Sequence, residues 1–250
     1  MNDGIAANRS TVPHPRDISD DDLSSAMDAA ARPDLLGRLV DISRRTFGFF
    51  PSHYHHAIGY PWMARTLEDL PRGSRVLDIG AGLSALPVFF AEMGAIVDCV
   101  DPHPVVRTPP PSADWNEWGF FEYGRVHRNL TAHHCAIADF ASSDSFDAIY
   151  SIMAIAHMRR TVREHALHRC SDLLRPGGTL TLTADLVPST DFLWNLSEGR
   201  VLEPPGPHGT VADTLRQLTC LGFQIKEARV HRMVPRSRTD LLFINCKSQN

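Results

Sequence analysis

Residues 75–84 read Arg-Val-Leu-Asp-Ile-Gly-Ala-Gly-Leu-Ser, an apolar and β-branched run that leads into a Gly-x-Gly turn. The amphipathic stretch 83–94 follows at once, so the pattern predicts a strand, a tight turn and a helix in direct succession. Glycines at such a turn let bare backbone and a helix N-terminus approach a bound molecule. This stretch therefore predicts an α/β sheet with a ligand at its first turn.

The next strand supplies a carboxylate at its carboxyl end. Residues 96–100 read Ile-Val-Asp-Cys-Val, and Asp101 follows them, 21 positions after Gly80. A carboxylate at that point can accept hydrogen bonds from both hydroxyls of a ribose. Tight turns favour glycine in any protein, and aspartate commonly follows strands. The two features in register nevertheless favour a ligand that contains a ribose.

Short β-branched runs alternate with helical stretches from residue 75 onward, which is typical of βαβ units in a doubly wound, mostly parallel sheet. Seven strands are expected, at 75–79, 95–100, 129–135, 146–151, 178–184, 223–230 and 239–246. Helices are expected between them, at 83–93, 113–121, 158–174 and 209–221. Before the sheet, helical stretches are expected from Ser19 or Asp20 to Arg32, from Leu35 to Phe47, and from Pro61 to Leu70.

Composition excludes several classes of protein. The 250 residues carry a formal net charge of −4, which disfavours a general nucleic-acid binder. The chain has no apolar run of the roughly 18 to 20 residues that cross a bilayer, and its N-terminus lacks a secretory apolar segment. The cysteines are scattered, without a Cys-x-x-Cys pair, which favours a reducing, cytoplasmic setting: Cys99, Cys135, Cys170, Cys220 and Cys246.

Two groups of side chains have simple alternative explanations. The clusters His53–His56 and His133–His134 lack partners at zinc-site spacing, so no metal site is expected. The basic residues Arg159, Arg160 and Arg163 are expected on a solvated helix face rather than in a binding site.

Residues 76–82, Val-Leu-Asp-Ile-Gly-Ala-Gly, resemble motif I of the class I S-adenosylmethionine-dependent methyltransferases. Nicotinamide-binding domains usually carry a third glycine where this chain has Ala85, and they have apolar residues before the turn, where this chain has Asp78. A carboxylate suits a cofactor that carries a sulfonium and an ammonium, whereas it would repel a pyrophosphate. The turn therefore favours S-adenosylmethionine over a nicotinamide cofactor.

The resemblance continues over roughly residues 60–246. Residues 145–157 resemble the fourth strand of the family and the segment after it, and residues 174–180 resemble the loop and fifth strand. Residues 222–225 and 241–246 resemble the closing hairpin, whose last strand is antiparallel in the family. Four motifs in this order imply a methyltransferase fold and S-adenosylmethionine as cofactor.

The resemblance also implies a set of cofactor contacts, in which Asp78 lies at the methionyl end, Asp101 at the ribose and Ser151 beside the sulfonium. The family usually has an aspartate for adenine at the position of Cys135. Adenine is then held either by Asp139 or by nearby backbone. The full expected set is Asp78, Gly80, Ala81, Gly82, Asp101, Pro102, Ala136, Ile137, Asp139 and Ser151.

His157 follows the fourth strand, where the substrate of such enzymes approaches the methyl group. An ordinary histidine pKa near 6.5 suits a general base, although a capping or half-buried histidine is the alternative. Aromatic and histidine-rich segments at 49–60, 114–121 and 188–209 are expected to border the acceptor. The residues expected to contact it are Tyr54, His55, His56, Trp115, Trp118, Trp194 and His208.

These features predict three parts of the chain: a disordered arm at 1–18, an N-terminal helical lid at 19–72, and a methyltransferase domain at 73–250. The expected activity is methyl transfer to a small organic acceptor, with the acceptor atom (O, N or C) open. No nucleic-acid or membrane partner is expected, and a homo-oligomer stays open. A nicotinamide-dependent oxidoreductase and a non-catalytic cofactor-binding protein are the alternatives.

Overall fold

The computed structural model of the chain describes residues 20–21, 23–24, 32–51, 54–106, 119–193, 196–197, 201–202, 206–232 and 239–249. Its helices are α2 (Pro33–Phe47), α3 (Tyr54–Thr66), α4 (Leu86–Met93), α5 (Arg160–Leu173) and α6 (Val211–Cys220), with 3-10 turns η1 (Tyr123–Arg125), η2 (Ile137–Asp139) and η3 (Ala154–His157). Its main strands are β1 (Arg75–Ile79), β2 (Ile96–Val100), β5 (Leu130–His133), β6 (Phe146–Ile152), β7 (Leu174–Leu186), β10 (Phe223–His231) and β11 (Asp240–Ser248). Short pairs are β3 (Val105–Val106) with β4 (Phe120–Phe121), and β8 (Leu196–Ser197) with β9 (Val201–Leu202).

The seven main strands form one sheet in the order β10-β11-β7-β6-β1-β2-β5. Only β11 runs against its neighbours in this sheet, and the other adjacent pairs are parallel. The predicted fold class is therefore confirmed. The chain order reverses between β1 and β6, and in such sheets ligands bind beyond the carboxyl ends of the strands at this reversal.

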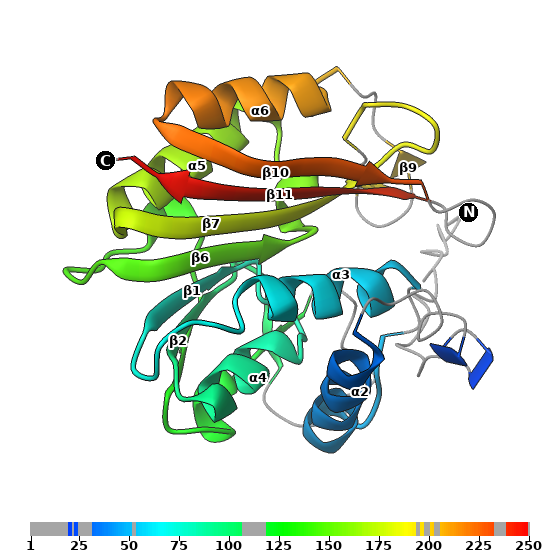
Figure 1. Cartoon of the computed structure of the whole chain (residues 1–250), viewed down its shortest axis with the longest axis vertical. Coiled ribbons are helices and arrows are strands. Elements are labelled where there is room, and N and C mark those ends of the chain that lie inside the picture. The colour runs from blue at the N-terminus through cyan, green and yellow to red at the C-terminus, as the bar shows by residue number, and fades with distance from the viewer. Residues whose placement is uncertain are drawn as a thin grey trace, which may run out of the picture.

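Helices cover both faces of the sheet. In Figure 1, α3 and α4 lie in front of the strands and α5 lies behind them. Alternate residues of β1 face the two sides, so Val76 belongs to the core cluster under α2, α3 and α4, while Leu77 belongs to the cluster under α5 and α6. Within the described part of the chain, no helix has the length and apolar character to span a membrane.

The helix predicted at 61–70 is wrong at both ends. Helix α3 begins at Tyr54 and ends at Thr66, so Pro61 lies inside it rather than in its first turn. Proline removes one backbone hydrogen bond from a helix, but packing of a buried face can compensate for that loss. Residues 59–64 are all buried, so the helix is packed on every side around Pro61.

The helix predicted at 113–121 is wrong at its end, because Phe120 and Phe121 form β4 beside β3. The Phe120 N–H donates to the carbonyl oxygen of Pro104 at 2.9 Å, so its backbone bond goes to another segment rather than to a preceding helical turn. Residues 113–118 of that prediction lie outside the described residues, as does the predicted arm at 1–18.

Candidate active site

The glycine turn after β1 leaves no room for a side chain at Gly80. Gly80 has φ +71°, and a Cβ on it would lie 2.3 Å from the Cβ of Ala154 in η3. Gly82 also has a positive φ, of +48°. The Gly80 N–H donates to the carbonyl oxygen of Val100 at 2.9 Å. The turn is thereby packed against the carboxyl ends of both neighbouring strands.

Asp78 is a buried carboxyl group directly before this turn. It is 2% exposed, and its register partners on the adjacent strands are Cys99 and Tyr150. Its Oδ2 has no hydrogen-bond partner among the described residues. Burial raises the pKa of Asp78 well above its usual range, and the negative charge of Asp101 adds to that shift, while the Tyr150 hydroxyl opposes it. A cationic or N–H donor would satisfy this oxygen.

Asp101 connects the glycine turn to the chain after β2. Its Oδ2 accepts the Gly82 N–H at 2.9 Å, and its Oδ1 accepts the His103 N–H at 2.8 Å. The ring Nδ1 of His103 lies 2.7 Å from the same Oδ1. A carboxylate has about four lone-pair sites. A ribose that used both oxygens would therefore need the His103 ring to move.

The residues predicted to hold adenine lie at the ends of β2 and β5. The Asp101 N–H donates to the His133 carbonyl oxygen at 3.2 Å, which joins these two strand ends. Ile137 is buried at the start of η2, whereas Asp139 is exposed at its end. The Pro102 carbonyl oxygen lies 3.0 Å from the ring Nε2 of His134. Neither of the two predicted ways of holding adenine is tested by these contacts.

The chain leaves β6 through a strained turn. Ser151 is fully buried, and its hydroxyl donates to the Ile79 carbonyl oxygen at 2.9 Å, so it ties β6 to β1. Met153 has a left-handed φ of 60° without being glycine, and its N–H donates to the Thr183 carbonyl oxygen at 3.0 Å. Strained residues often mark functional turns. This turn directs η3 across Gly80, and His157 lies half-buried at the end of η3.

Helix α3 places aromatic side chains beside the turn. His56 and Tyr60 stack with ring centroids 5.0 Å apart and an interplanar angle of 21°. A Cβ on Gly59 would lie 3.4 Å from the Met153 methyl group, so α3 contacts the strained turn after β6. Burial raises the pKa of Tyr60, and the nearby charge of Asp78 adds to the shift. The side chains of Tyr54 and His55 are outside the described structure.

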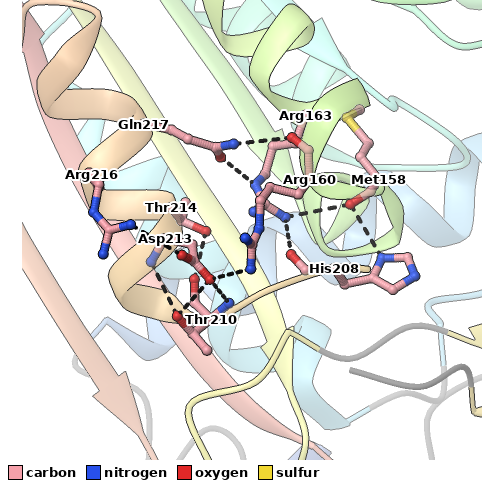
Figure 2. Close-up of polar contacts among 9 residues, drawn as sticks. All are labelled: Met158, Arg160, Arg163, His208, Thr210, Asp213, Thr214, Arg216 and Gln217. Atoms are coloured by element: carbon pink, nitrogen blue, oxygen red, sulfur yellow. Dashed lines mark hydrogen bonds and ion pairs between the residues drawn. The ribbon is translucent and has the colours of Figure 1, made fainter. Parts of the chain in front are cut away.

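His208 is buried, with its ring Nδ1 3.3 Å from the carbonyl oxygen of Met158, the residue after His157. The backbone at His208 is held from α5, because the Nη1 of Arg163 donates to the His208 carbonyl oxygen at 2.7 Å. Figure 2 shows Arg163 between this carbonyl and Gln217 of α6, whose Oε1 accepts from Nε at 2.9 Å.

The expectation that Arg163 faces solvent is wrong, since its side chain is fully buried. Arg163 thereby connects α5 through hydrogen bonds with Met158, His208 and Gln217.

Three predicted acceptor contacts, Trp115, Trp118 and Trp194, lie outside the described residues. Sequence reasoning did not single out His103, which contacts Asp101, or Tyr123, whose hydroxyl lies against the glycine turn. Neither residue belongs to a recognisable motif, so a single sequence carries no signal for them. In the part of the chain that the structure describes, no cluster of three or more His, Cys, Asp or Glu side chains could hold a metal ion.

Residues 77–182 match the family model described as a methyltransferase domain. Over these residues the chain is similar to a methyltransferase domain, and its fold is that of the class I enzymes. The predicted resemblance to the S-adenosylmethionine-dependent enzymes of this class is therefore confirmed, and S-adenosylmethionine is the cofactor of such a domain.

Solved methyltransferases share a fold with most of this chain. The 1,6-didemethyltoxoflavin-N1-methyltransferase of Burkholderia thailandensis, crystallised with 1,6-didemethyltoxoflavin and S-adenosylhomocysteine, has a TM-score of 0.60 at 19% identity, over 94% of each chain. The N-methyltransferase NodS from Bradyrhizobium japonicum WM9 has a TM-score of 0.50 at 16% identity, over 92% of this chain and 98% of that chain. At these identities the matches establish the fold.

A curated relative, Uncharacterized protein Rv1509 of Mycobacterium tuberculosis, is 25% identical over 118 residues. The match covers 47% of this chain and 38% of that relative, so the chain spans well under two thirds of the relative's length.

The described residues at the glycine turn fit S-adenosylmethionine. S-adenosylmethionine carries an ammonium group and a sulfonium cation, and Asp78 offers a buried oxygen that lacks a partner beside a turn of bare backbone. Asp78, Gly80 and Gly82 would hold the methionyl end, and Asp101 would hold the ribose. These assignments stay predictions.

Proposed function

We propose that the protein transfers a methyl group from S-adenosylmethionine to a small organic acceptor. One observation carries the proposal: the buried Oδ2 of Asp78 has no hydrogen-bond partner among the described residues. Asp78 directly precedes the glycine turn and lies within residues 77–182, which match the methyltransferase model. A desolvated carboxylate binds a cation strongly. When bound, the cofactor supplies a methyl group on a sulfonium sulfur, and this sulfur is a good leaving group because it departs as the neutral thioether S-adenosylhomocysteine.

The same carboxylate argues against a nicotinamide cofactor. A pyrophosphate at this turn would bring negative charge toward Asp78 and Asp101, whose charges already act on each other. Ala85 stands at the N-cap of α4, where nicotinamide-binding turns usually have glycine. We therefore prefer methyl transfer to hydride transfer.

We propose that the acceptor lies between α3 and η3. His56 is half-buried and stacks on the buried ring of Tyr60, and His157 lies half-buried at the end of η3, which follows the strained turn at Met153. Residues there would orient the acceptor and exclude water, and such positioning accounts for much of the acceleration of a displacement reaction. The 1,6-didemethyltoxoflavin-N1-methyltransferase, whose fold is shared, acts on a small molecule and supports this substrate class.

We propose that His157 removes a proton from acceptors that need it. A general base contributes roughly 10²–10⁴-fold to a rate. His157→Ala should lower turnover by about that factor and leave affinity for S-adenosylhomocysteine nearly unchanged. The loss should shrink for an acceptor analogue that is already deprotonated. Turnover within about twofold of the parent would assign His157 a structural role.

The N-terminal segment 19–72 is proposed to act as a lid. The contact of α3 with Met153 supports this role for its described part. We also propose a cytoplasmic location, which agrees with five free cysteine thiols, three of them buried.

Isothermal titration with S-adenosylhomocysteine and with NAD⁺, followed by a screen with methyl-labelled S-adenosylmethionine, tests the proposal. Micromolar binding of the first ligand, weak binding of NAD⁺ and label transfer to a small molecule are expected. Comparable binding of NAD⁺ without binding of S-adenosylhomocysteine would assign an oxidoreductase. Cofactor binding with no transfer to any tested acceptor would favour a non-catalytic binding protein.

A further inference from the structure

The segment that follows β4 lies against the glycine turn. Tyr123, the first residue of η1, is fully buried. Its ring is enclosed by three phenylalanines, with centroid distances of 6.3 Å to Phe47, 6.0 Å to Phe120 and 5.4 Å to Phe121. A ring packed on several sides has one orientation, so its hydroxyl has a fixed place.

That place is inside the curve of the turn. The Tyr123 oxygen accepts the Ser84 N–H at 2.8 Å. The carbonyl oxygens of Gly82 and Ser84 each lie 3.1 Å from it, and that of Ala81 lies at 3.3 Å. A hydroxyl has one proton to donate, so these three carbonyls share it. Burial raises the pKa of Tyr123 well above its usual range, which keeps this proton in place.

The peptide groups of Gly82 are held on both sides. Its N–H donates to Asp101 Oδ2 at 2.9 Å, and its carbonyl oxygen accepts the Phe121 N–H at 3.2 Å besides facing Tyr123. Ser84, whose N–H is held by Tyr123, accepts the Leu86 N–H on its own hydroxyl at 3.2 Å, at the start of α4. One phenol therefore connects the turn to the N-terminus of the helix that follows it.

We propose that Tyr123 is a positioning residue that holds the backbone of residues 81–84 in the shape that binds the cofactor. This inference rests on the proposed function, because it assumes that the turn receives S-adenosylmethionine. Without the hydroxyl, the Ser84 N–H loses a buried partner and the turn can adopt other shapes. Binding must then select the competent shape from several, which lowers the apparent affinity.

The test compares two variants that each delete one buried hydroxyl. Tyr123→Phe should weaken binding of S-adenosylhomocysteine in isothermal titration by about tenfold, since a buried group left without its hydrogen bond is costly. Thr214→Val is the control, because Thr214 is also a fully buried residue, but its hydroxyl donates to the carbonyl oxygen of Thr210 at the N-cap of α6, on the opposite face of the sheet. It should lower the Tm slightly and leave the affinity unchanged.

A second readout separates positioning from general damage. With any acceptor found in the screen, Tyr123→Phe should raise KM for S-adenosylmethionine and leave kcat at saturating cofactor within about twofold, because binding restores the competent shape. Parental affinity in Tyr123→Phe, or an equal loss in Thr214→Val, would overturn the proposal.

Hydrogen exchange of the parent protein covers the case in which Tyr123→Phe does not fold. The Ser84 amide should exchange slowly without ligand and more slowly with S-adenosylhomocysteine. Exchange at the rate of an exposed loop amide would overturn the positioning role. Failure of the parent to bind S-adenosylhomocysteine would instead overturn the proposed function, while slow exchange at Ser84 in the free protein would still support the hydroxyl contact.

Discussion

Two buried ionisable side chains, Asp78 and Arg163, lie on opposite faces of the sheet and are treated differently by the fold. Asp78 lies on the α3 and α4 face, and burial raises its pKa well above the usual range. Arg163 extends from α5, and burial lowers its pKa to about 10, with Arg160 adding to the shift. The arginine therefore stays charged at neutral pH, whereas ionising Asp78 costs free energy.

Their partners explain the difference. The Nε and Nη1 atoms of Arg163 donate to Gln217 and to the carbonyl oxygens of His208 and Met158. Asp78 Oδ2 has no such set of partners among the described residues, and the Tyr150 hydroxyl is the one group that favours its charged form. The described part of the chain supplies hydrogen bonds to Nε and Nη1 of Arg163 and leaves only Nη2 without one, so this charge is largely satisfied as part of the architecture. A buried carboxyl oxygen without a partner beside a glycine turn is instead suited to a ligand. Substitutions at the two sites should therefore separate stability from cofactor affinity.

Arg163→Met gives the largest expected effect, and it falls on stability. The His208 carbonyl and the Gln217 side chain would lose their shared partner, which costs about 3 kcal/mol. For a chain of this size, thermal unfolding should shift downward by roughly 6–12 °C. Affinity for S-adenosylhomocysteine, measured by titration, should stay within about twofold.

Arg216→Met is the matched control for that substitution. Arg216 belongs to the neighbouring helix shown in Figure 2, but its side chain is 72% exposed and pairs with Asp213 at 3.6 Å. Exposed ion pairs contribute little to stability. A Tm loss in this variant as large as in Arg163→Met would contradict the special role of the buried arginine.

Gly80→Ala should act mainly on the cofactor site. Its Cβ would lie 2.3 Å from that of Ala154, so the turn or η3 must shift, and S-adenosylhomocysteine affinity should fall by about 50-fold as the ordered turn is lost. Gly177→Ala isolates backbone strain, because Gly177 has a similar φ of +75° with nothing within 4 Å of the added Cβ. That control should lose stability but not affinity. Equal affinity losses would mean that strain, not the clash, governs binding.

Whether the sequence could predict a feature of the two sites depends on how far apart along the chain the contacting residues lie. The strands and the turn could be predicted, because the run from Arg75 to Ser84 carries its own local pattern of apolar residues and glycines. The Tyr123 contact joins residues 39 positions apart, and no local pattern reports such a pairing. Arg163 was expected to be solvated because of its residue type, yet the segment at His208 packs over it. Only the folded chain brings these groups together.

The bounds of helix α3 also could not be predicted from the sequence, in this case because tertiary packing outweighs a local preference. Proline is a strong local signal for a helix start, so the sequence predicts that Pro61 opens the helix. The buried side chains of Ala57 and Met63 lie on either side of it, and tertiary packing outweighs the local preference. The site residue His56 consequently lies within α3, whereas the sequence predicts a helix that begins only at Pro61.

Asp78→Asn should weaken S-adenosylhomocysteine binding by about twentyfold, because it removes the charge that we propose faces the cofactor's ammonium. The same substitution should raise the Tm of the ligand-free protein near pH 7. Native Asp78 has a pKa above its unfolded value, so its contribution to stability is fully present at acidic pH and is lost as the pH rises through the native pKa. The Tm advantage of the variant should thus grow between about pH 4 and pH 8.

Scanning calorimetry across that pH range, with and without S-adenosylhomocysteine, measures both effects. A variant that is less stable than the parent at pH 8 without ligand would show that Asp78 is satisfied within the fold. The comparison with Arg163 would then fail.

His103→Ala gives the smallest expected effect and tests how Asp101 is shared. The His103 ring Nδ1 lies 2.7 Å from Asp101 Oδ1, the atom that also accepts the His103 N–H. Removing the ring frees a lone pair for a ribose hydroxyl but keeps the backbone bond, so S-adenosylhomocysteine affinity should rise by about two- to threefold as the competing contact disappears. Titration of adenosine beside S-adenosylhomocysteine separates the ribose end from the methionyl end, and both ligands should gain equally. A loss of affinity for both would instead make the His103 ring a ligand contact, and Asp101 would then hold the turn at Gly82 rather than the ribose.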